Sequence, residues 1–364
     1  MLFREYGYNI FDQPGWMSSR RLLVTKMEKQ EIAMGLNQSA QLNVRLGPRR
    51  LGHANIFVSD VEKASGFYSA VCGVRGVFRE PGIMAIFHSN GNSHHDVGLM
   101  QVTEQPRVGR GGHVQVSSGR GFTPGLNHLG FEMENEKTLV AAWERAKALG
   151  LEMRTTDHGM SHSIYVFDPE GNYLEFYADM IDDWRSFYSS NENQLISGDW
   201  HPDPAKADES RRYSTSFEPD AVPGAASRPR RISRVTLLAD DLPLMANYYR
   251  EVAGLKVIAG GESEGCLVFS GTAGEPSMAL FARGSSPKGL HHLSFELADE
   301  AAVDEGARGL SEKGIPVLAR IDNAWKKSLV ISDPDGMKIE FYAQRPGSLP
   351  APASLPQAER LFLI

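Results

Sequence analysis

The sequence contains one block of residues twice, and this duplication limits the possible folds more than any other feature. The segment GLNHLGFEM (125–133) is closely matched by GLHHLSFEL (289–297). Two further blocks recur in the same order, VFDPEGNYLEFYA with ISDPDGMKIEFYA and LGHANIFVSDVEKASGFYSAVCGV with ISRVTLLADDLPLMANYYREVAGL. Because three blocks repeat at nearly constant spacing, we predict two copies of one domain.

A weaker repeat lies inside each half. Residues 51–74 have the pattern of a short apolar strand, a capping Asp, an amphipathic helix and a Gly, and residues 126–150 follow the same plan. Short apolar segments come after each helix, and DPEGN and DPDG between them are typical of tight turns. We therefore predict two βαβββ units in each half and four in the chain.

Loss of this periodicity marks the expected boundaries. Residues 181–229 and the end of the chain are rich in Pro, Ser, Asp and Arg. The predicted organisation is an N-terminal extension (1–48), a first domain (49–180), a linker (181–229), a second domain (230–345) and a C-terminal tail (346–364).

Composition narrows the function classes. A net charge of −7 leaves no basic face for nucleic acid or an anionic membrane, and no run approaches the ~20 apolar residues of a membrane span. The start of the chain carries charges within five residues and no apolar core of a signal peptide. Cys72 and Cys266 match no metal or redox spacing. We expect a cytoplasmic protein with two reduced, buried cysteines.

The repeated blocks resemble a known superfamily. LGHANIFVSDVEKASGFY, GLNHLGFEM and DHGMSHSIYVFDPEGNYLEFYAD are similar to the vicinal oxygen chelate proteins, and within them to the type I extradiol ring-cleaving (catechol 2,3-dioxygenase-like) enzymes. The resemblance covers residues 50–180 and 230–345. It implies an α+β fold of two tandem domains, each a cupped mixed sheet of two βαβββ units. It also implies a homo-oligomer acting on a small aromatic substrate.

The resemblance implies a metal centre in the first half. In this fold the ligands lie on the first strand of each unit and the last strand of the second unit, which here carry His53, His128 and Glu175. Two histidines and one carboxylate on one face of an ion leave three positions open, as iron oxygenases require. We expect Fe(II), with Mn(II) as a substitute and O2 as co-substrate.

The second half aligns Arg234, His292 and Glu340 with these three residues. A guanidinium cannot ligate a cation. We therefore predict a degenerate domain without metal, in which Arg234 pairs with Glu340.

The resemblance also implies acid–base groups beside the metal. His113 lies fifteen residues before His128, and Tyr165 lies ten before Glu175, at the offsets of the family's proton-shuttling His and substrate-binding Tyr. A further His precedes that Tyr, and both His158 and His162 are candidates. We favour His162. The second half lacks counterparts of this set.

Two other functions are open to the same fold. A glyoxalase-like isomerase or lyase would need a fourth ligand from residues 94–102, where Asp96 is the one carboxylate. A non-catalytic protein that binds aromatic ligands would not need the full metal triad. We expect His94 and His95 to face solvent, with His95 as an alternative candidate for the pocket.

Overall fold

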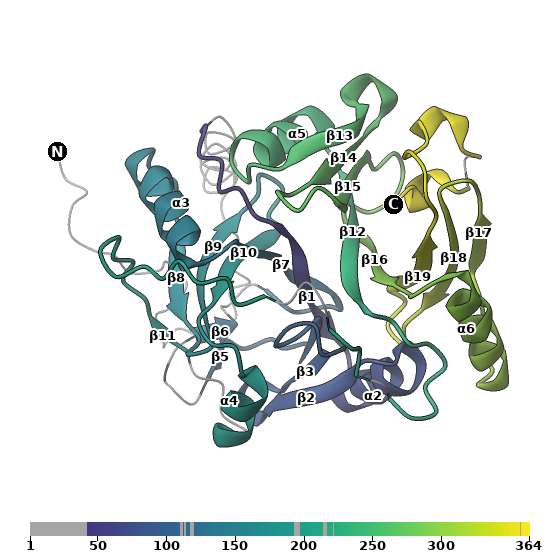
Figure 1. The fold of residues 1–364 in the computed structure, drawn as a ribbon, viewed down its shortest axis with the longest axis horizontal. Coiled ribbons are helices and arrows are strands. Elements are labelled where there is room, and N and C mark those ends of the chain that lie inside the picture. Colours follow the sequence, from purple (N-terminus) through teal and green to yellow (C-terminus); the bar gives the residue numbers. More distant parts are fainter. Residues whose placement is uncertain are drawn as a thin grey trace, which may run out of the picture.

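The computed structural model describes residues 42–109, 112, 114–116, 120–192, 197–213, 217–220, 222–356 and 358–364. It contains two large mixed sheets that meet at the centre of the molecule, with helices around the periphery (Figure 1). The predicted fold class of two tandem vicinal oxygen chelate domains is confirmed. Cys72 and Cys266 are both free and buried.

The first sheet has nine strands, in the order β11-β8-β9-β10-β7-β1-β4-β3-β2. Its two βαβββ units join where β1 pairs antiparallel with β7, while β1–β4 and β7–β10 are parallel. The strands are β1 (Arg50–Val58), β2 (Arg75–Glu80), β3 (Ala85–Ser89), β4 (Val97–Gln101), β7 (Gly125–Glu132), β8 (Arg154–Asp157), β9 (Ser161–Phe167), β10 (Tyr173–Asp179) and β11 (Gly198–Asp199). A separate two-stranded ribbon consists of β5 (Arg107–Val108) and β6 (Val114–Val116).

The second sheet repeats this arrangement with eight strands, in the order β13-β14-β15-β12-β16-β19-β18-β17. They are β12 (Arg231–Ala239), β13 (Lys256–Gly261), β14 (Cys266–Ser270), β15 (Pro276–Ala282), β16 (Gly289–Glu296), β17 (Ala319–Asp322), β18 (Lys326–Ser332) and β19 (Lys338–Gln344). The register repeats as well, because His53 lies opposite Gly130 and Arg234 opposite Ser294, each beside a bulge. The duplication therefore extends to individual backbone irregularities.

Four helices follow the first strands of the four units, each with an Asp or Asn at its N-cap. Asp60, Asn135, Asp241 and Asp299 accept backbone N–H bonds from the first turns, which satisfies donors that a helix start leaves free. These helices are α2 (Val61–Phe67), continued by a π-helical turn η1 (Tyr68–Cys72), α3 (Glu136–Ala148), α5 (Leu242–Glu251) and α6 (Glu300–Glu312). A fifth helix, α4 (Trp184–Ser190), and strand β11 arise from the segment expected to be a linker.

Side chains along β1 point alternately to the hydrophobic core and to the concave face of the first sheet, which is called the cup below. Ala54, Ile56 and Val58 are buried in the large hydrophobic core that both domains share. His53 and Asn55 point to the opposite face, as the two-residue period of a strand requires. The concave face of the first sheet is therefore where polar side chains gather.

The two DPxG turns reach across to the other domain. Tyr249 of α5 donates its hydroxyl to Asp168 Oδ2 (2.9 Å), and Tyr68 of η1 donates to Asp333 Oδ2 (3.3 Å). Backbone N–H groups at the starts of the same two helices bond Glu170 and Asp335 of these turns. Burial raises the pKa of Asp168 to about 6. Each domain thus supplies the acidic turn to which the first helix of the other domain is hydrogen-bonded.

Candidate metal centre

Three side chains from three adjacent strands converge in the first cup. His53 Nε2 lies 2.9 Å and His128 Nε2 3.0 Å from the same oxygen of Glu175, Oε2. All three residues are buried, with exposures of 0%, 9% and 4%. Register shifts in the β1–β7 pairing lie directly before His53 and directly after Asn55, the two β1 residues whose side chains enter the cup. These residues are the candidate metal ligands, and the fold brings all three together.

Neighbouring groups fix the orientation of these ligands. Ser163 donates its hydroxyl to Glu175 Oε1 at 2.6 Å, which leaves Oε2 directed at the two histidines. Asn127 Oδ1 lies 3.1 Å from His128 Nδ1, an arrangement that favours the tautomer with its proton on Nδ1 and its lone pair on Nε2. Metal-binding histidines are normally held in this way through their second nitrogen.

The protonation states suit a cation. Desolvation lowers the pKa of His53 to about 4, which keeps its imidazole neutral. Burial alone would raise the pKa of Glu175, but the adjacent His53 and His128 outweigh burial and hold that pKa well below its usual range. Two imidazoles and one carboxylate fit a divalent iron or manganese ion.

A glycine makes room for the first ligand. A Cβ atom on Gly130 of β7 would lie 2.1 Å from His53 Nε2, far inside any van der Waals contact. At the matching place the second domain has Ser294, whose hydroxyl donates to Glu340 Oε2 at 2.9 Å. This Gly-to-Ser difference is visible in the duplicated blocks, and its meaning becomes clear only from the register.

The structure brings Tyr165 to the site together with His158. The Tyr165 hydroxyl lies 2.9 Å from His158 Nε2, and both residues line the pocket. Burial, reinforced by the Glu175 carboxylate, raises the pKa of Tyr165 well above its usual value. Burial lowers the pKa of His158 to about 4. The pair therefore consists of a phenol and a neutral imidazole.

His162 lies on the other face of β9, because its side chain alternates with those of Ser161 and Ser163. Its Nδ1 is 2.6 Å from Glu136 Oε1 of α3, and its ring stacks on Trp200. The preference for His162 over His158 therefore does not match the structure, which brings His158 to Tyr165 instead. His113 lies outside the described residues.

His94 and His95 are buried, so the expectation that they face solvent is wrong. Their exposures are 5% and 6%, and both line the pocket. His94 Nδ1 is 3.1 Å from Asp179 Oδ1, and the His95 ring lies over that of His53 with 4.1 Å between centroids. The ligand atoms of His53, His94 and His95 also lie within 4.8 Å of one another. No periodic signal marked these residues, because they lie on the loop before β4.

Asp96 faces away from the ligands. Its carboxylate accepts the backbone N–H groups of Asn90 (2.8 Å) and, across the domain boundary, of Ile232 (3.0 Å). The one carboxylate available for a fourth, glyoxalase-like ligand is therefore engaged in joining the two domains.

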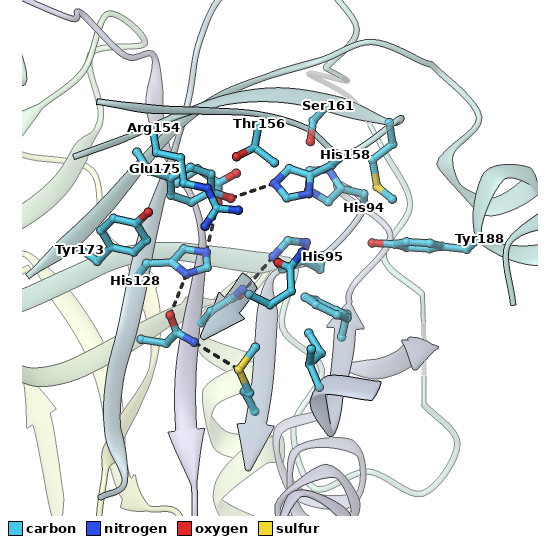
Figure 2. A pocket seen from close by; sticks show the side chains of 18 residues that line it. His94, His95, His128, Arg154, Thr156, His158, Ser161, Tyr173, Glu175 and Tyr188 are labelled. Carbon is cyan, nitrogen blue, oxygen red and sulfur yellow. Dashed lines mark hydrogen bonds and ion pairs between the residues drawn. The ribbon is translucent and has the colours of Figure 1, made fainter. Parts of the chain in front are cut away.

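A pocket opens beside the candidate ligands (Figure 2). His128, Glu175 and Tyr173 form one side, and Tyr188 of α4 reaches in from the opposite side. Ile83, Phe87, Met100 and Met160 supply an apolar floor that continues into a hydrophobic cluster with Tyr188. The cavity, of about 80 Å³, is open to solvent. Such a cleft, polar at one end and apolar below, suits a small aromatic ring.

The second cup is filled. The cation that pairs with Glu340 is Lys326 (2.6 Å), so the predicted partner Arg234 is wrong; its guanidinium bonds Gln344 and lies over the Tyr342 ring. Lys326 is fully buried and stands where the first domain has Ser161. Phe362 of the tail packs on the His292 ring at 4.8 Å. Lys326 thus pairs with Glu340 through Oε1, while the Ser294 hydroxyl bonds Oε2, the oxygen equivalent to the one that the two histidines share in the first cup.

The chain was compared with protein families and with individual proteins. A model of the Glyoxalase/Bleomycin resistance protein/Dioxygenase superfamily matches residues 50–176 and 231–341. The chain is 28% identical over 133 residues to a catechol-2,3-dioxygenase of Bacillus subtilis (strain 168). That match covers 35% of this chain and 40% of the relative, so the chain spans less than half of that relative's length in the alignment.

Solved structures share the fold over most of the chain. A 2,3-dioxygenase from Pseudomonas sp. KL28 matches with a TM-score of 0.59 and 17% identity, covering 85% of this chain and 96% of the other. A Mn(II)-bound glyoxalase from Novosphingobium aromaticivorans gives 0.56 and 14%, covering 82% of each. A homoprotocatechuate 2,3-dioxygenase variant from B. fuscum gives 0.56 and 18%, covering 82% and 72%. Within the described residues no helix is long and apolar enough to cross a membrane.

Proposed function

The chain belongs to the Glyoxalase/Bleomycin resistance protein/Dioxygenase superfamily, and we propose that it is an extradiol dioxygenase with its metal in the first domain. The proposed reaction inserts both atoms of O2 into a small catecholic substrate and opens the ring beside its hydroxyls. The observation that carries the proposal is the convergence of His53 Nε2 and His128 Nε2 on Glu175 Oε2 at the wall of a pocket. The dioxygenases among the similar proteins support it.

The proposed ligands are His53, His128 and Glu175, with Fe(II) as the metal and Mn(II) as a substitute. A divalent iron ion held by this set supplies Lewis acidity and one-electron chemistry. The three residues come from β1, β7 and β10, which line the same wall of the cup. With Asp96 engaged by backbone groups, the pocket side of the ligand set stays open to a substrate with two oxygens.

Proton handling is assigned to Tyr165 and His158, together with His113. Because the pKa of Tyr165 is raised, its hydroxyl remains a donor at neutral pH and stabilises a catechol oxygen that has lost its proton. His158 Nε2, 2.9 Å away, stays neutral and holds that hydroxyl in place. Stacking of Tyr165 on Tyr173 (5.1 Å) holds the phenol in place.

The proposal is tested by anaerobic reconstitution with Fe(II) or Mn(II), followed by measurement of O2 uptake and of a yellow ring-opened product with a panel of catechols. We expect uptake with the wild-type protein and its loss, together with loss of bound metal, in His53→Ala and Glu175→Gln. His201→Ala, at an exposed histidine, is the matched control. No uptake with any catechol, combined with turnover of a thiol adduct supported by Ni(II) or Zn(II), would instead favour glyoxalase-like chemistry.

A further inference from the structure

The pocket is also lined by hydroxyl side chains that are not candidate metal ligands. Thr156 of β8, Ser161 of β9 and Tyr188 of α4 line it, with exposures of 1%, 2% and 5%. Each carries a hydroxyl, and each comes from a different element. Figure 2 shows the Tyr188 hydroxyl pointing into the pocket from the side opposite His128 and Tyr173.

One of these hydroxyls is unusual for a buried group. The Thr156 Oγ1 atom has no hydrogen-bond partner among the described residues. Burial, with the nearby Asp179 charge, raises the pKa of Tyr188, so its hydroxyl stays protonated and donates. Buried polar atoms are nearly always bonded, and an unpartnered one beside a pocket points to a ligand that supplies the missing bond.

Packing holds Tyr188 at this position. Its ring stacks on Phe78 of β2 with 4.4 Å between centroids, and Trp184 contacts it edge-on. An aromatic side chain fixed in this way has little freedom to turn its hydroxyl out of the pocket. The hydroxyl therefore serves as a fixed donor rather than a mobile one.

The space available limits the ligand to one ring. The cavity of about 80 Å³ is smaller than the ~150 Å³ cavity that holds a benzene molecule, so a single ring must use the open mouth as well. A second ring placed inside the cavity would have to displace Phe87, Met160 or Tyr188, which line it.

We infer, resting on the proposed function, that Thr156, Ser161 and Tyr188 form a subsite for a short, oxygen-bearing substituent on a single-ring catechol. The catechol oxygens face Glu175 and the histidines, and the oxygen of the substituent exchanges hydrogen bonds with hydroxyls of this subsite, accepting no more than two. The subsite discriminates because a buried donor left without a partner costs binding free energy when an apolar analogue binds.

The test compares 4-(hydroxymethyl)catechol with 4-methylcatechol, which differ by one hydroxyl. Two quantities are measured for each: the dissociation constant with metal-loaded protein under anaerobic conditions, and kcat/KM for O2 uptake. We expect the wild type to favour the hydroxymethyl compound about tenfold or more, and Tyr188→Phe or Ser161→Ala to reduce that ratio about 3- to 10-fold. Ser189→Ala, an exposed α4 hydroxyl that bonds the Arg185 carbonyl, is the control and should leave the ratio unchanged.

Equal binding of the two compounds, or a ratio unaffected by both variants, would overturn the subsite. Binding of 2,3-dihydroxybiphenyl as tight as that of the single-ring compounds would overturn the size limit. The anaerobic arm keeps this test separate from the proposed function: a binding preference that follows Tyr188, without O2 uptake, refutes the dioxygenase proposal and leaves the subsite standing.

Discussion

Adding one methyl group to Gly130 should destroy the candidate metal centre without unfolding the protein. In Gly130→Ala the new Cβ would lie 2.1 Å from Nε2, 2.2 Å from Cε1 and 2.4 Å from Cδ2 of His53, whereas ordinary contacts begin at 3.4 Å. The imidazole must therefore retreat by more than 1 Å. Metal–ligand distances tolerate about 0.2 Å, so His53 is lost as a ligand and metal affinity should fall about 100-fold or more.

The same clash predicts that the effects of substitutions at Gly130 and His53 on the unfolding free energy are coupled. With His53 present, overpacking should cost about 1–3 kcal/mol of unfolding free energy, and in a His53→Ala background the cost should nearly vanish because the ring is gone. Anaerobic calorimetric titration with Fe(II) or Co(II) measures the affinity, and urea unfolding of the four proteins in the cycle measures the coupling. A Gly130→Ala protein that binds metal within threefold of the wild type, or a cost that persists without His53, would refute the reasoning.

Three further predictions concern other parts of the molecule. Tyr165→Phe should lower kcat about 100-fold or more while the metal dissociation constant stays unchanged, because the hydroxyl handles protons and is not a ligand; a kcat within threefold of wild type contradicts this assignment. Asp168 has a folded-state pKa of about 6 against an unfolded value near 3.9. Its contribution to the unfolding free energy is therefore present below pH 4 and is lost, by about 3 kcal/mol, as the pH rises through 6. In urea unfolding across this range, the unfolding free energy of Asp168→Asn should decline less steeply with pH than that of the wild type. Lys326→Met should destabilise the protein by about 3–5 kcal/mol because it leaves Glu340 buried and unpaired, and adding Glu340→Gln should restore much of the loss in thermal unfolding.

The duplicated blocks were enough to predict the fold, because strand and helix periodicity repeats four times along the chain. The three candidate ligands could be named because the repeated blocks resemble a known superfamily, whose ligand positions fall on His53, His128 and Glu175; in the second half Arg234 stands out where a ligand would be. The sequence could not show which face of a strand a residue occupies when that residue lies near a turn. His158 and His162 are four residues apart, and only the start of β9 at Ser161 shows that His162 faces α3.

Contacts between segments distant in the chain were equally hidden. Lys326 is an ordinary basic residue in a strand pattern until the sheet places its ammonium 2.6 Å from Glu340. His94 and His95 lie on a polar loop, and their burial depends on the fold around them. Tyr188 belongs to a stretch without strand periodicity, yet α4 carries it into the pocket wall.

Each DPxG turn is hydrogen-bonded to the first helix of the other domain, so removing the second domain would affect the first. Cutting the chain after the first sheet would strip Tyr249 from Asp168 and leave Tyr68, at the end of α2, without Asp333. The first copy would then expose the face on which β1 is buried, while every candidate ligand was still present. The second domain thus stabilises the domain that holds the candidate metal centre. Substitutions in its own cup leave these interdomain contacts intact, whereas substitutions that unfold it would release the neighbouring helix and loosen the first cup.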